Sequence, residues 1–213
     1  MKPVVFNGID SPYDWKLFDR MLPKRFRPSY LDDVHDYESA LMEGLVSSVK
    51  HGDHVVVIGG GVGITAVSAA NLAGKEGQVT CYEASQRQLP LIERCIARNG
   101  VEDRVTLVPA AIARNSQAYG GKSFALPVMP ASELPECDVL EMDCEGAEAE
   151  ILDALRFRPR VIIVETHGVY GAPTQAIHEI LDAKGYDVAD FGWAEPRVAN
   201  LCEKNDIRVL LGS

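Results

Sequence analysis

The sequence has no apolar run long enough to cross a membrane, and no apolar stretch behind a basic N-terminus that would mark a secretory signal. Its five cysteines are an odd number and include no C-x-x-C pair, which disfavours a disulfide framework or a structural zinc site. These absences predict a cytoplasmic protein with reduced thiols and no membrane partner.

Positive charge and aromatic rings are also scarce. Lys and Arg number 21 against 31 Asp and Glu, which gives a net charge of −10, and aromatic residues make up 7% of the chain. An acidic surface repels phosphate backbones. The one local group of cations, Lys24, Arg25 and Arg27 around Phe26, is short and is typical of a solvated loop. We therefore expect no nucleic-acid partner.

Apolar residues are plentiful enough for one well-packed domain, since 46% of the 213 residues are hydrophobic. Prolines and aromatic residues punctuate residues 1–36, which we interpret as an irregular N-terminal arm or lid. Residues 37–213 are expected to form a single domain. The oligomeric state cannot be predicted from the sequence.

Short apolar runs alternate with segments of helical periodicity. The run 54–58 is typical of a strand buried on both faces. The seven strands predicted in this way are 54–58, 78–83, 104–108, 138–142, 160–165, 186–191 and 207–211. The alternation predicts a doubly wound α/β fold with a mostly parallel seven-stranded sheet. The last two strands leave no room for a full helix between them, which predicts an antiparallel hairpin at one edge.

Helices are predicted between the strands, beginning with 38–50 and a small-residue helix closed by Gly74. Ser85 and Gln88 are spaced as a capping box for the helix after the second strand, although Pro90 favours a late start. Thr174 is a candidate N-cap for the helix after the fifth strand.

A glycine-rich loop joins the first strand to its helix. The loop residues that we expect to contact a cofactor are Gly59, Gly60, Gly61, Gly63 and Thr65. Glycines let the backbone turn tightly and let a ligand lie against bare peptide groups. The spacing G-x-G-x-G differs from the dinucleotide fingerprint G-x-G-x-x-G, because residue 64 is isoleucine. This spacing favours S-adenosylmethionine over NAD.

Glu83 ends the second strand, twenty residues after Gly63. A carboxylate at this place can accept hydrogen bonds from both ribose hydroxyls of an adenosine. The adenine is then expected near Ala84, Ala110 and Ala111, which follow the second and third strands.

With these features the sequence resembles class I methyltransferases and, among them, the FkbM-like family, over residues 37–188. Four blocks carry the resemblance: Tyr37-Glu38, Gly59–Gly63 with Glu83, the D-x-E-G-x-E segment Asp143–Glu148, and Val164-Glu165-Thr166-His167. The resemblance implies an S-adenosylmethionine-dependent O-methyltransferase acting on hydroxyls of small molecules or sugars. The family usually has an acid at position 57 that helps to fix the donor's methionine end. Because Val57 cannot do so, either another group replaces the acid, with Glu38 as our candidate, or the affinity for the donor is reduced.

The acceptor chemistry is assigned to the fourth and fifth strand ends. Methyl transfer needs alignment of nucleophile, methyl and sulfur, together with removal of a hydroxyl proton. His167 is our candidate base, because histidine titrates near neutrality. Asp143 is expected to face the sulfonium, and Asp143, Glu145 and Glu165 complete the predicted catalytic group. We assign no metal, although these four side chains could instead converge on Mg²⁺ or Ca²⁺.

Two other functions stay open at this stage. One is an NAD-dependent oxidoreductase, which would require a glycine or alanine at position 64 and a catalytic arrangement that the sequence does not offer. The other is a donor-binding protein without turnover, which Val57 makes conceivable. The preferred partner is a small-molecule or glycan acceptor.

Overall fold

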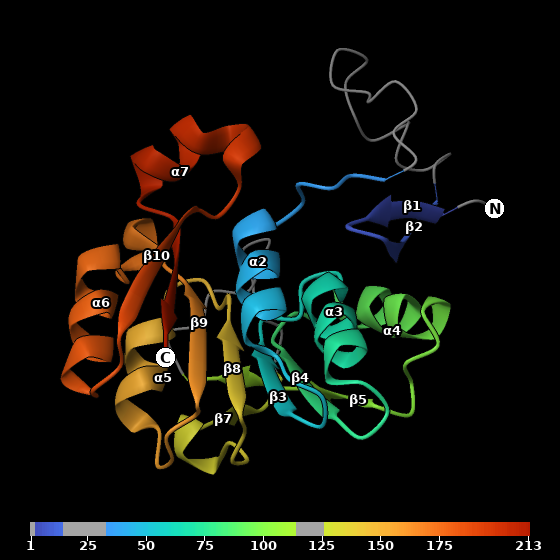
Figure 1. Cartoon of the computed structure of the whole chain (residues 1–213), viewed down its shortest axis with the longest axis horizontal. Helices are drawn as coiled ribbons and strands as arrows, with labels where there is room; N and C mark the ends of the chain where they lie inside the picture. The colour runs from blue at the N-terminus through green and yellow to red at the C-terminus, as the bar shows by residue number, and fades with distance from the viewer. Residues whose placement is uncertain (1–2, 15–32, 114–125) are drawn as a thin grey trace.

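A seven-stranded sheet with helices on both faces forms the body of the protein (Figure 1). The structure, a computed structural model, describes residues 3–14, 33–113 and 126–213. The strand order is β10-β11-β9-β8-β3-β4-β5. The strands are β3 (His54–Ile58), β4 (Gln78–Glu83), β5 (Val105–Pro109), β8 (Val139–Met142), β9 (Val161–Glu165), β10 (Val188–Trp193) and β11 (Arg208–Gly212). All neighbours are parallel except β11, which is antiparallel to both β9 and β10. The predicted sheet and edge hairpin are confirmed.

Two apolar layers hold the helices against the sheet. The five helices that cover it are α2 (Ser39–Ser48), α3 (Ile64–Ala73), α4 (Leu89–Arg98), α5 (Glu148–Ala154) and α6 (Thr174–Ala183). Alternation along β3 sends Val55 and Val57 into the layer beneath α2, α3 and α4, while Val56 and Ile58 enter the layer beneath α5 and α6. Both faces of the central strands are therefore buried, as their apolar runs predict.

The connection between β10 and β11 corrects one prediction. It contains the short η4 (Pro196–Val198) and the helix α7 (Ala199–Asn205), where we expected no room for a helix. Seven residues are enough for two turns. Only Cys202 of α7 is buried, so the sequence carries little of the apolar periodicity from which a helix is predicted.

Two predicted helix caps are also absent. Helix α4 begins at Leu89 with no side-chain cap, and the Ser85 N–H instead donates to Glu83. The late start that Pro90 favours is therefore seen without the capping box. At α6 the N-cap is Pro173, and the N–H of Thr174 donates to Asp206, 32 residues away. A tertiary partner thus replaces the predicted local cap.

The described part of the N-terminal arm is regular, which corrects the expectation of an irregular segment. Strands β1 (Pro3–Phe6) and β2 (Ile9–Asp14) form an antiparallel hairpin outside the main sheet, near α3 and α4 (Figure 1). Arg98 of α4 donates to the carbonyl of Ser11 and to the Asp14 carboxylate. The cations at 24–27 and the aromatic residues Trp15, Phe18 and Phe26 lie outside the described residues.

A smaller pair of strands follows β5. Strand β6 (Ala111–Ile112) pairs in parallel with β7 (Val128–Met129), which leads into η2 (Ala131–Glu133), and residues 114–125 between them are outside the described part. Within the described ranges, no helix combines the length and apolar character that a membrane span requires.

Candidate donor site and active site

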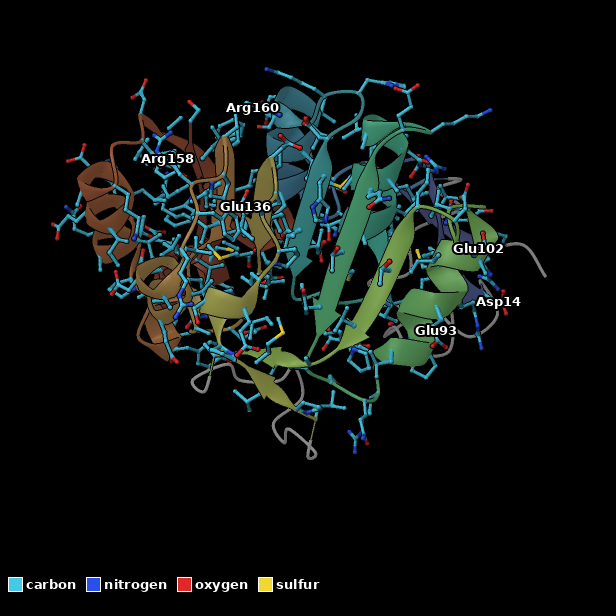
Figure 2. All side chains as sticks on the ribbon, turned by 90° about the horizontal axis from the view of Figure 1, so that it is seen from below. Asp14, Glu93, Glu102, Glu136, Arg158 and Arg160 are labelled. Carbon is cyan, nitrogen blue, oxygen red and sulfur yellow. The ribbon has the colours of Figure 1, made fainter. Side chains whose placement is uncertain are left out.

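One edge of the sheet collects the predicted site residues. The loop Gly59–Gly63 follows β3, Glu83 ends β4, Asp143 follows β8 and Glu165 ends β9. Glu136 and Arg160, which precede β8 and β9, mark the opposite edge (Figure 2). In an open α/β sheet, ligands bind beyond the carboxyl ends of the strands, so the geometry favours a ligand site at the first of these edges.

Gly59 brings the glycine loop into contact with the segment after β8. Its φ is 96°, and a Cβ at this position would overlap the carbonyl oxygen of Asp143. The Asp143 N–H donates to the carbonyl of Ile58 at 2.9 Å. Only glycine fits this crossing, because both the backbone angle and the space exclude a side chain.

Gly61 is the open position of the loop. Its φ is 54°, and a Cβ there would meet nothing within 4 Å. Its N–H donates to Oε2 of Glu83 at 3.0 Å, and Oε1 of the same carboxylate accepts from Ser85 at 2.6 Å. Burial raises the pKa of Glu83, while these backbone hydrogen bonds lower it. Glu83 is thus held beside the exposed backbone of the loop.

The remaining predicted donor residues lie around this point. Gly60 packs against Cys81 and Ile92, and Gly63 against Cys95, so these glycines serve close packing on β4 and α4. The other predicted residues are Thr65, which is buried in the first turn of α3, Ala84, which is half-buried after β4, and the buried Ala110 and Ala111 after β5. Small side chains therefore follow the ends of β4 and β5.

His167 is held by a residue whose role the sequence analysis missed. Its Nδ1 lies 2.7 Å from Oε1 of Glu148, and both side chains are buried. The same Glu148 oxygen accepts from the Gly146 N–H at 3.2 Å. Position 148 is the last acid of the D-x-E-G-x-E segment, which is the signal that could have identified it. Its place at the start of α5 offered a sufficient local explanation through the helix dipole.

The other ring nitrogen of His167 faces three carboxylates. Nε2 lies 3.4 Å from Asp143 Oδ1, 3.5 Å from Glu165 Oε1 and 3.7 Å from Glu145 Oε2. Burial lowers the pKa of His167, but the Glu148 hydrogen bond and the neighbouring negative charges outweigh it and raise the pKa to about 9. The ring therefore carries a proton at neutral pH in the ligand-free protein.

This group also has the ligand types of a divalent metal site. One atom each from Asp143, Glu165 and His167 lies within 4.8 Å of the others. Carboxylate oxygens suit Mg²⁺ and Ca²⁺, and an imidazole nitrogen suits transition metals. The bond from His167 Nδ1 to Glu148 is the outer-shell contact that orients a metal-binding histidine. Three of the four residues that the sequence suggests as possible metal ligands thus come together, and Glu145 is not part of this group.

Two further acids lie on the α2 side of the strand ends. Glu38, which precedes α2, has a left-handed backbone (φ 46°), and burial together with the charge of Asp143 raises its pKa to about 8. Glu141 of β8 was not predicted. It is fully buried, and burial, Asp143 and Glu38 raise its pKa well above the usual range. In the β3–β8 pair its register partner is Val57.

Comparisons with known proteins bear on the family and on the fold. Residues 128–188 match the family model described as the Methyltransferase FkbM domain. No curated protein matches the sequence. Among solved structures, precorrin-6y C5,15-methyltransferase from Geobacter metallireducens is similar with a TM-score of 0.56 and 17% identity, over 83% of this chain and 86% of that chain.

Two further structures have the same fold. Fibrillarin from Aeropyrum pernix, solved with natively bound S-adenosyl-L-methionine, has a TM-score of 0.54 and 14% identity over 83% of this chain and 76% of its own. A SAM-dependent methyltransferase from Aquifex aeolicus has a TM-score of 0.52 and 13% identity over 94% of this chain and 97% of its own. The protein therefore has the class I methyltransferase fold, and its resemblance to the FkbM family is confirmed over residues 128–188.

Proposed function

We propose that this protein is an S-adenosylmethionine-dependent O-methyltransferase that acts on a hydroxyl of a small molecule or glycan. The observation that carries the proposal is the position of His167, which is held by Glu148 and faces the acids after β8 and β9. Through Gly59 and Asp143 this group adjoins the glycine loop. A proton-accepting group beside a donor loop is what methylation of a hydroxyl requires.

The donor's adenosine is assigned to the first two strand ends. Glu83 accepts hydrogen bonds from the ribose hydroxyls, and the open backbone at Gly61 lets the ligand approach. The adenine lies near Ala84 and the Ala110-Ala111 segment. Asp143 then faces the positive sulfonium, which its carboxylate stabilises.

The reaction is an in-line displacement at the donor methyl carbon. The acceptor oxygen forms the new bond to this carbon as the carbon–sulfur bond breaks, and S-adenosylhomocysteine leaves as a neutral thioether. The acceptor proton passes to Nε2 of His167, with the Glu148 carboxylate stabilising the cation that forms. Because the pKa of His167 is about 9, this base is strong but mostly protonated at neutral pH.

A metal-dependent version of this reaction is a second candidate, favoured by the grouping of Asp143, Glu165 and His167. A bound divalent cation would acidify the acceptor hydroxyl. In this version His167 is a ligand and takes no proton. Activity that disappears on EDTA treatment and returns with Mg²⁺ or Mn²⁺ would replace the base mechanism by this one.

The acceptor class is proposed from charge. The net charge of −10 and the acids at the site disfavour a polyanion such as RNA. One similar structure is described as a putative rRNA-methylase. At 14% identity, this similarity is evidence for a shared fold and not for a shared substrate. RNA is therefore included among the acceptors to be tested, as the alternative substrate.

Two measurements test the proposed function. Calorimetric titration should detect binding of S-adenosylhomocysteine and none of NAD, and the reverse would support an oxidoreductase. Transfer of a labelled methyl group should then be measured on a panel of sugars, polyols, phenols and RNA, with His167→Ala as the comparison. A wild-type rate that His167→Ala leaves unchanged would rule out the base. Donor binding without transfer to any acceptor would support a non-catalytic protein.

A further inference from the structure

We infer that Glu141 binds the amino group of the donor's methionine end, and so supplies from β8 the acid that the family usually has at position 57 of β3. This inference rests on the proposed function, because it assumes that S-adenosylmethionine binds at the glycine loop. It adds a residue that neither the sequence pattern nor the comparisons assign.

The strand register places Glu141 at the same level as Val57. The two residues are partners in the parallel β3–β8 pair. Register partners in adjacent parallel strands project to the same face of a sheet, about 4.8 Å apart. Val57 lies two residues before Gly59, and Glu141 lies two residues before Asp143. Compared with the usual family acid at position 57 of β3, the Glu141 carboxylate therefore lies on the neighbouring strand, at the same distance along the strands from the edge of the sheet where the ligand is proposed to bind.

Glu141 is costly to the ligand-free protein. The side chain is fully buried on β8, and neither of its oxygens has a hydrogen-bond partner among the described residues. Most buried polar side chains are paired, and an unpaired one costs stability. An apolar residue would suit this position better, since its neighbours in register on both sides are Val57 and Ile163. The structure alone gives no reason for the carboxylate, whereas a ligand would.

The surroundings of Glu141 identify the charge of the missing partner. The charged groups that act on it in the described part of the chain, Asp143, Glu38 and Glu165, are all acidic. No described Lys or Arg is paired with it. The methionine end of the donor carries an ammonium group, which has three N–H donors and no acceptor. An ammonium group would satisfy both the charge and the open oxygens.

The inference also divides the work among the acids. Glu83 recognises the ribose, Asp143 faces the sulfonium and Glu141 recognises the amino group. Glu38, our sequence-based substitute for the missing acid, acts on Glu141 from the start of α2. The intact amino acid of the donor is then distinguished from ligands that contain only the adenosine and sulfur.

Calorimetric titration of two ligands tests this role. S-adenosylhomocysteine carries the amino group, and 5′-methylthioadenosine lacks the whole amino-acid end. Glu141→Gln keeps the shape and removes the charge, so it should weaken binding of S-adenosylhomocysteine by about tenfold or more, as expected for a hydrogen bond to a charged group. Binding of 5′-methylthioadenosine should change by less than about twofold.

A rescue variant separates this role from a structural one. Val57→Asp, added to Glu141→Leu, returns a carboxylate to the same level on the neighbouring strand and should recover most of the affinity for S-adenosylhomocysteine. Glu93→Gln, on the exposed surface of α4 (Figure 2), is the control for loss of one acid and should bind like the wild type.

The outcomes are distinct. Equal affinity of Glu141→Gln and the wild type for S-adenosylhomocysteine would overturn the inference and leave the proposed function intact. An equal loss for both ligands would overturn it as well, by showing a general structural effect. If the wild type binds neither ligand, the proposed function fails together with the inference.

Discussion

His167 and Glu148 form a buried pair, with Nδ1 of the histidine 2.7 Å from a carboxylate oxygen at the start of α5. The pair joins the loop after β9 to the helix after β8. It fixes which ring nitrogen faces the acids after the strands, because Nδ1 is occupied by Glu148. The acid–base behaviour of the site therefore depends on a residue that does not itself face the acceptor.

The first prediction concerns the pH dependence of methyl transfer. A base works only when deprotonated, and the pKa of His167 is about 9, so kcat should rise with pH, reach half of its maximum near pH 9 and level off above that pH. Glu148→Gln removes the anion that stabilises the protonated ring and should move the inflection to lower pH. Steady-state rates between pH 6 and 10 measure both. A wild-type profile that is flat over this range would contradict the assignment of the base.

The second prediction concerns the stability of the donor-free protein. His167 (pKa about 9) and Glu38 (pKa about 8) bind their protons more tightly in the folded chain than in the unfolded one. The stability that they contribute is complete below the unfolded pKa values and is lost as the pH rises through the folded ones. The melting temperature should therefore fall between about pH 4.5 and pH 9, first through Glu38 and then through both groups. Glu38→Gln should make the fall smaller, and a melting temperature that rises over this interval would contradict the prediction.

The third prediction concerns the cost of Glu141. Replacing the unpaired buried acid by leucine should stabilise the donor-free protein by about 1–3 kcal/mol, or about 2–4 °C for each kcal/mol. The same variant should show a smaller increase in melting temperature on addition of S-adenosylhomocysteine. Thermal melts with and without the ligand measure both effects. A donor-free melting temperature below that of the wild type would show that the carboxylate serves the fold.

The fourth prediction separates two glycines of the donor loop. Gly61→Ala adds a methyl group on the open face, so the variant should fold, with about 1–2 kcal/mol of backbone strain, and bind the donor more weakly. Gly59→Ala collides with the Asp143 carbonyl and should lose much more stability. Circular dichroism and calorimetric titration distinguish the two variants. Equal stability of both would show that the loop can move away from Asp143.

The fifth prediction concerns the N-terminal hairpin. Arg98 donates at 2.6 Å to the Ser11 carbonyl and at 2.7 Å to Asp14, so Arg98→Ala should loosen β1 and β2 at a cost of about 1–3 kcal/mol. Limited proteolysis should then cut the hairpin faster. Arg94→Ala is the matched control, because its single bond to the Pro12 carbonyl is long, at 3.4 Å. An unchanged cleavage rate for Arg98→Ala would contradict the anchoring role.

Much of the fold could be predicted because its signals are local. The apolar run 54–58 and the glycines that follow it give both a strand and its turn. Helix α7 escaped prediction because it buries almost nothing, and the cap of α6 because Asp206 reaches Thr174 from a distant part of the chain. Periodicity describes one element at a time and cannot show such contacts.

The site could also be predicted only in part. His167 and Asp143 stand out as polar residues directly after apolar strands. Glu148 already had an adequate explanation as the first residue of a helix, and its bond to His167 spans 19 residues. In the sequence, Glu141 is a single acid within a predicted strand, and nothing next to it in the chain indicates a ligand-binding role. The role that we propose for it depends on its register with Val57, which is fixed only when β3 and β8 pair.

The crossing of Gly59 and Asp143 gives the protein a mechanical property. The backbone of the donor loop rests directly on the backbone that carries the first acid of the active site, with no side chain between them. A shift of either segment must therefore displace the other. Under the proposed function, the loop that binds the donor and the segment that faces the acceptor are therefore coupled through main-chain contact alone.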